Sequence, residues 1–204
     1  MKRNVLILFG MFFLLLFGCG KKAIQEAVLP LTEEQISRAV DYGIKNASLS
    51  VTEFTRDWTV DLGYDQGKGT ATIITPFLKV ALLSRQAALS GEKPDERVIR
   101  TAIKEDTDFI NFDLLLFGGS PKFPRTVEFH LKYAGREIKP SYCFMPSYGE
   151  IARDYTMSAK CRVKFSRAGI PPDAKIVLVA SFKPDEETKE VSVAEFQFDL
   201  KKYL

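Results

Sequence analysis

The chain is poor in the residue types that build most catalytic and metal sites. Its 204 residues include one histidine, three cysteines and one tryptophan. A Ser-His-Asp site needs a histidine held in a cleft by a third group, and the single histidine, His130, lies in an alternating stretch that predicts a solvated strand face. One histidine and no close cysteine pair also exclude the usual zinc sets. We therefore expect a protein that is not an enzyme and that needs no metal or cofactor.

The chain also lacks a block of one charge. It has 29 basic and 26 acidic residues, and no run of five or more basic residues occurs. Proteins that bind nucleic acid usually cluster lysine and arginine to neutralise phosphates. We therefore expect no nucleic-acid partner. The charged stretch at 183–190 mixes both signs and predicts a solvated loop.

Two glycine-rich or acidic patterns fail on their spacing. The segment 63–70 has three residues between its first two glycines, whereas a phosphate-binding loop has four and continues with lysine and then serine or threonine. Asp57, Asp61 and Asp65 recur every four residues, but the calcium-binding loop spaces its ligands by two and closes with glutamate. The segment predicts a hairpin turn.

The most informative segment that is present is the amino-terminal one. Lys2 and Arg3 precede an apolar run at 5–17, which Gly10 alone interrupts. A run of this length is short of the roughly 20 residues that cross a bilayer as a helix. It has the form of an export signal, so we expect residues 1–18 to be a leader that is removed.

The residues that end this run, Leu-Phe-Gly-Cys at 16–19, resemble the lipobox of bacterial lipoproteins. The resemblance covers residues 1–19 only. It implies a diacylglyceryl thioether on Cys19, a lipidated tether at 19–30 and membrane lipid as a partner. Gly20, in place of the aspartate that retains many lipoproteins at the inner membrane, implies an outer membrane with the protein facing the periplasm. The alternative is an ordinary secretory signal in which Cys19 is incidental.

Residues 31–204 are expected to form a single globular domain, with 31–106 mostly helical apart from one hairpin. Thr32 and Gln35 have the spacing of a capping box and predict a helix at 32–47. Thr75 and Pro76 predict the start of a second helix, which would run to Leu89, although the apolar density of 77–89 also suits a buried strand. Further expectations are an extended segment at 50–62, a returning strand at 69–74 and a third helix at 95–105.

Residues 107–204 change to a period of two. Apolar and polar residues alternate at 127–133, 157–165 and 194–200, while 176–180 is apolar on both faces. Additional strands are expected at 109–117 and 138–145. The pattern predicts an α+β fold, namely an antiparallel β-sandwich of immunoglobulin-like or transthyretin-like form with N-terminal amphipathic helices. The Cys…Trp…Cys spacing of a true immunoglobulin domain is absent, so this resemblance concerns the architecture alone.

Two cysteines remain once Cys19 is assigned to lipid. Cys143 and Cys161 could form a disulfide in an oxidising envelope compartment. Against the bridge, Cys161 belongs to the apolar set of its strand, whereas Cys143 alternates with Tyr142 and Phe144 and so tends toward the polar face. Both outcomes stay open from the sequence.

Aromatic residues crowd two loop-rich segments and are candidates for contact with a partner. The candidate residues are Phe117, Phe123, Tyr142, Phe144 and Tyr148. The alternative is that their rings cover the ends of the sandwich.

These observations lead to one functional expectation and one alternative. We expect a membrane-anchored lipoprotein of the bacterial cell envelope that acts as a non-catalytic binding or assembly module for a protein partner. The alternative is a periplasmic carrier of a small ligand or lipid, with a pocket between the helices and the sheet.

Overall fold

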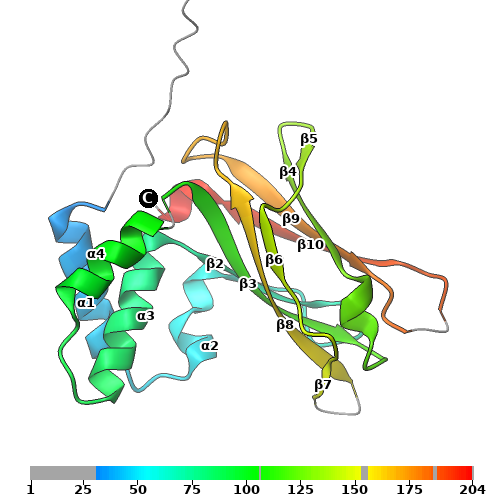
Figure 1. The fold of residues 1–204 in the computed structure, drawn as a ribbon, viewed down its shortest axis with the longest axis horizontal. Coiled ribbons are helices and arrows are strands. Elements are labelled where there is room, and N and C mark those ends of the chain that lie inside the picture. Colours follow the sequence, from blue (N-terminus) through cyan, green and yellow to red (C-terminus); the bar gives the residue numbers. More distant parts are fainter. Residues whose placement is uncertain (1–30, 106, 153–155, 186–187, 204) are drawn as a thin grey trace, which may run out of the picture.

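The chain folds into a β-sandwich with a lobe of helices at one end (Figure 1). The structure is a computed structural model, and it describes residues 31–105, 107–152, 156–185 and 188–203. The leader and tether predicted at 1–30, with Cys19, lie outside the described residues. None of the helices in the described ranges is long and apolar enough to span a bilayer.

The helices begin where the sequence places their caps. Thr32 and Gln35 form the expected capping box, with Gln35 N–H donating to Thr32 Oγ1 at 3.2 Å and Thr32 N–H donating to Gln35 Oε1 at 2.9 Å. Thr75 caps the next long helix, with Pro76 at its first position. The helices are α1 (Glu33–Lys45), α2 (Val51–Phe54), α3 (Pro76–Leu89) and α4 (Glu96–Glu105).

Two antiparallel sheets form the sandwich, as the alternating pattern predicts. The first, sheet A, has the order β1-β2-β3-β8-β6 with β7 beside β8, and the second, sheet B, has the order β10-β9-β4-β5. Sheet A contains β1 (Thr59–Asp61), β2 (Gly69–Ile74), β3 (Phe109–Gly118), β6 (Tyr142–Phe144), β7 (Glu150–Ile151) and β8 (Met157–Ser166). Sheet B contains β4 (Glu128–Tyr133), β5 (Arg136–Ile138), β9 (Lys175–Phe182) and β10 (Ser192–Asp199).

The two sheets face each other across one continuous apolar core. Alternate residues of β3 and β8 point inward from sheet A and meet those of β9 and β10 from sheet B. The largest side chains that are fully buried in this core include Phe112, Phe165, Phe182, Phe196 and Leu178. Their burial excludes water from both inner faces and is the main source of stability in the sandwich.

The helices α3 and α4 form an insertion between two strands that pair directly, whereas α1 and α2 precede β1. β2 ends at Ile74, α3 and α4 follow, and the chain then returns in β3, which pairs with β2 so that Asn111 lies opposite Ile74. Both ends of the insertion are therefore fixed to one end of sheet A (Figure 1). The carboxyl-terminal 3₁₀ helix η4 (Leu200–Tyr203) lies at that same end.

The structure corrects two expected strands. The segment 50–62 is extended only at β1, because Ser50 and Glu53 form a second capping box that starts α2. The segment 138–145 is not one strand either. The chain leaves sheet B at Ile138 and enters sheet A at Tyr142, with Pro140 between them.

The expected division of the domain at residue 106 is not a spatial one. The hairpin of β1 and β2 belongs to sheet A, where it extends the sandwich beside β3. Strands from both halves of the sequence therefore build one core, and only the helices form a separate layer.

Within the helical lobe, α1 and α3 pack closely at Gly43. This glycine is buried, and a Cβ added there would collide with the backbone carbonyl of Ala81 and with Ser84 on α3. The absence of a side chain therefore lets the two helix backbones approach each other.

We predict that Gly43→Ala lowers the free energy of unfolding by about 1–3 kcal/mol, because the methyl group forces the helices apart. In an exposed helix the same change would stabilise by roughly 1 kcal/mol. Thermal denaturation of the two forms measures the difference. Ser37→Ala, an exposed change on the same helix, is the control and should leave the melting temperature nearly unchanged. A Gly43→Ala protein that melts at a higher temperature would contradict the close packing.

Candidate functional site

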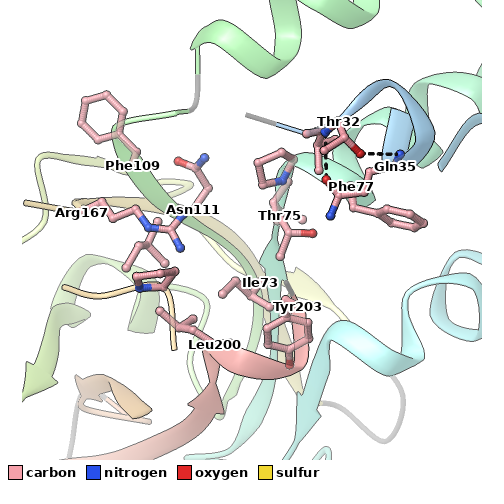
Figure 2. A pocket seen from close by; sticks show the side chains of 15 residues that line it. Thr32, Gln35, Ile73, Thr75, Phe77, Phe109, Asn111, Arg167, Leu200 and Tyr203 are labelled. Atoms are coloured by element: carbon pink, nitrogen blue, oxygen red, sulfur yellow. Dashed lines mark hydrogen bonds between the residues drawn. The ribbon is translucent and has the colours of Figure 1, made fainter. Parts of the chain in front are cut away.

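A cavity of about 320 Å³ lies where the helical lobe meets the sandwich, and we call it the junction pocket (Figure 2). Its walls come from the first turns of α1 and α3, the paired ends of β2 and β3, the turn after β8, and η4. The lining residues are Leu31, Thr32, Gln35, Ile73, Ile74, Thr75, Pro76, Phe77, Phe109, Ile110, Asn111, Arg167, Pro172, Leu200 and Tyr203.

The pocket is mainly apolar, and the geometry of the insertion explains why it exists. The chain leaves sheet A at Ile74 and returns at Phe109, so α3 and α4 are joined to the sheet at the strand ends. The cavity lies between these strand ends and the helices. Side chains from η4 close the floor, where Leu200 and Tyr203 lie below Ile73 in Figure 2. A concave, apolar site with few polar groups is the usual form of a small-ligand site.

One of the polar groups in this wall is Asn111, which is 5% exposed. Its side-chain oxygen and nitrogen are both buried, and neither has a hydrogen-bond partner within the described part of the chain. An amide needs an acceptor for its N–H groups and a donor for its oxygen. Leaving a buried polar group without a hydrogen bond lowers the stability of the fold by about 1–3 kcal/mol. A bound ligand that pairs with Asn111 would remove this cost.

The other polar group of interest is the guanidinium of Arg167, on the same wall as Asn111 and across from Thr75 and Phe77 (Figure 2). The backbone N–H of Arg167 donates to the Asp108 carbonyl at 2.9 Å, which fixes the turn beside the start of β3. Burial lowers the pKa of Arg167, and no described carboxylate offsets this effect. Arginine nevertheless remains charged at neutral pH.

A second hollow of about 390 Å³ adjoins the junction pocket and shares Leu31, Gln35, Phe77 and Tyr203 with it. Its other lining residues are Arg38, Asp57, Trp58 and Lys202, so it is more polar. Burial, together with Asp199 and Asp57, raises the pKa of the Tyr203 hydroxyl. Tyr203 therefore stays neutral at physiological pH and can serve as a hydrogen-bond donor between the two hollows.

The two cysteines of the expected disulfide are both free thiols. Cys143 pairs with Val163 across β6 and β8, and Val163 points into the core as Cys161 does, so the two cysteines share a face but are diagonal neighbours. The Cα atoms of diagonal neighbours lie about 7–8 Å apart, beyond the usual span of a disulfide. The parity expected for Cys143 is corrected as well, because Tyr142 and Phe144 are the residues on the outer face.

The five aromatic candidates divide into two groups. Phe117 and Phe123 are 5% and 1% exposed, so the structure contradicts a docking role for these two. Phe123 packs against Phe182 in the core, and the Phe117 ring meets the Tyr64 ring at 5.4 Å. The remaining three, Tyr142, Phe144 and Tyr148, are each at least half exposed.

His130 lies on the outer face of β4, and its Nε2 is 3.6 Å from Glu137 Oε1. That distance is too long for a hydrogen bond. Among the described residues, no group of three histidine, cysteine or acidic side chains gathers as a metal would require. Asp61 and Asp65 instead accept hydrogen bonds from Gly63 and Lys68 within the turn.

No known protein family model matches the chain, and no curated protein matches it either. The junction pocket brings together residues from α1, β2, α3, β3, the turn after β8 and η4. Sequence reasoning placed a pocket between helices and sheet but named neither Asn111 nor Arg167. The available signal was weak, because Asn111 is one of two polar residues, with Asp113, inside the apolar run at 109–117.

We predict that native protein is alkylated at Cys143 at least ten times faster than at Cys161. Burial raises the pKa of the Cys161 thiol to about 12, and it raises the pKa of the more exposed Cys143 above its ordinary value of about 9. Because the thiolate is the reactive form, labelling of Cys143 by iodoacetamide should still increase above pH 9. Peptide mass spectrometry measures both sites, with denatured protein as the control. A peptide that joins the two cysteines in unreduced protein would contradict the free thiols.

Proposed function

We propose that this chain is a lipid-anchored, non-catalytic binding protein of the bacterial cell envelope that holds a small apolar ligand in the junction pocket. The observation that carries the proposal is the pocket itself, an apolar cavity whose wall holds the Arg167 guanidinium and the side-chain amide of Asn111, which has no partner among the described residues. This combination is typical of a ligand site. It favours the carrier over the protein-docking alternative, since two of the five aromatic candidates are core residues.

The proposed anchor would keep this pocket close to a membrane. Leu31 lines the pocket and is 12 residues from Cys19. A chain of this length spans at most roughly 40 Å when fully extended. A pocket within that distance of a lipid leaflet suits a ligand that is released from, or delivered to, the membrane. We further propose that the leaflet is that of the outer membrane, facing the periplasm.

We also propose that the sandwich is immunoglobulin-like or transthyretin-like in its finer form. Its two antiparallel sheets and the crossing of the chain from sheet B to sheet A between β5 and β6 support this. Such a scaffold leaves its strand ends and loops free to carry function.

Docking of a protein partner is the second candidate function. The outer face of sheet A supports it, because Tyr142 lies opposite Lys164 and Phe144 lies opposite Arg162 on the neighbouring strand β8. Exposed aromatic rings and arginine side chains are enriched in protein interfaces. Tyr148, whose ring lies under the Arg125 guanidinium at 4.5 Å, extends the same chemistry.

We predict that the chain incorporates a palmitate analogue in bacteria and that Cys19→Ser abolishes the label completely, because the lipidated sulfur is lost. Fluorescent detection of the labelled chain after electrophoresis measures incorporation. Cys143→Ser is the matched control and should keep the label. Equal labelling of the Cys19→Ser and unaltered chains would contradict the anchor.

We predict that the full chain, purified in detergent from its membrane, retains an apolar small molecule that native mass spectrometry detects. Pro172→Phe should reduce the retained fraction at least tenfold, because the larger ring occupies the pocket. Pro121→Phe, an exposed change away from the junction pocket, is the control. Retention that is equal in both variants, or absent from the unaltered chain, would contradict the carrier and favour the docking function.

A further inference from the structure

The unpaired side-chain amide of Asn111 in the junction pocket indicates which polar group a ligand should carry. This inference rests on the proposed function. Asn111 presents a donor and an acceptor, both buried and both without a partner in the described part of the chain. A carboxylate ligand could accept from the Asn111 N–H but has no hydrogen to donate to the Asn111 oxygen. An amide satisfies both, since its C=O accepts from the Asn111 N–H and its N–H donates to the Asn111 oxygen.

The charge of the pocket points to an anion next to that amide. Arg167 supplies a full positive charge, and none of the fifteen lining residues is acidic. The first turn of α3, which holds no acidic residue, also lines the cavity, and a helix amino terminus carries a partial positive charge. The guanidinium has a planar fork that matches a carboxylate with two parallel hydrogen bonds.

The remainder of the wall requires an apolar chain. Leu31, Ile73, Phe77, Phe109 and Leu200 also line the cavity and offer no charged atom. A volume of 320 Å³ is about ten times the share of one water molecule in the liquid, which is room for a head group with a chain of medium length.

We propose that the junction pocket binds an apolar chain that ends in an amide followed by a carboxylate, with Arg167 holding the carboxylate and Asn111 pairing with the amide. This is the chemistry of an N-acyl amino acid and of the carboxyl-terminal residue of an apolar peptide. The carboxylate is ionised at neutral pH, and binding forms no covalent bond.

The test compares three probes of similar length. N-octanoylglycine carries both the amide and the carboxylate, undecanoate carries the carboxylate alone, and N-ethyloctanamide carries the amide alone. The full chain in detergent micelles is titrated with each probe, with empty micelles as the blank. Emission of Trp58, the single tryptophan of the chain, reports binding because its ring stacks on Phe77, which lines the pocket, with centroids 6.1 Å apart.

We predict that N-octanoylglycine binds at least tenfold more tightly than either of the other probes. Arg167→Gln should remove its advantage over N-ethyloctanamide, and Asn111→Leu should remove its advantage over undecanoate. Lys183→Gln removes an exposed positive charge away from the pocket and should leave all three affinities unchanged. Asn111→Leu should also raise the melting temperature of the free protein, since it eliminates an unpaired buried amide.

Each other outcome overturns a stated part. If the three probes bind with equal affinity, the pocket binds apolar ligands without distinguishing the amide or the carboxylate. This inference then fails while the proposed function stands. If none binds, the proposed function fails as well. If Asn111→Leu lowers the melting temperature and leaves the affinities unchanged, Asn111 has a structural role.

A second arm separates the two sources of this head group. Acetyl-leucyl-leucine with a free carboxyl terminus represents the peptide, and the same peptide with an amidated terminus is its control. Tighter binding of the free-acid peptide than of N-octanoylglycine assigns the pocket to peptide ends, and the reverse order assigns it to acylated amino acids.

Discussion

The pairing of the end of β2 with the start of β3 is the constraint on which the rest of the structure depends. Ile74 lies opposite Asn111 in this ladder, and the chain between them forms α3 and α4. In an antiparallel pair, the end of one strand lies beside the start of the next. The chain that forms α3 and α4 must therefore leave and return at one end of sheet A. The helical lobe is therefore held over the end of the sandwich, and the junction pocket is the space beneath it.

The same pairing holds the side chain of Asn111 in a buried position at the pocket wall. Asn111 is held in the ladder by its backbone, so its amide remains at the pocket wall whether or not a ligand is present. The backbone of Arg167 is held beside it by the bond between its N–H and the carbonyl of Asp108. A backbone that is fixed before binding loses little conformational entropy on binding, which favours affinity for a complementary ligand. The stability lost at these positions is small beside the burial of the aromatic core.

Local signals predicted much of the fold. The caps at Thr32 and Thr75 and the period-two strands at 157–165 and 194–200 agree with the structure, because a cap or an alternating face is encoded by neighbouring residues. The capping box at Ser50 could have been found in the same way, since Glu53 stands three residues later.

Other features depend on contacts between distant segments and could not be predicted from local pattern. Phe123 looks like an exposed loop aromatic in sequence, yet it packs on Phe182 of β9. The site is of this kind too. Asn111 and Arg167 are far apart in sequence, and only the joining of β3 to β8, together with the turn that follows β8, brings both to one cavity.

The measurement that tests the account most directly is a methyl NMR titration of the full chain, labelled at isoleucine, with N-octanoylglycine. A ligand in the junction pocket should shift the methyl signals of Ile73, Ile74 and Ile110, which line it, while the signal of the exposed Ile151 on β7 stays unchanged. Shifts that are confined to Ile151, or that occur at no isoleucine, would contradict a ligand site between the helices and the sandwich.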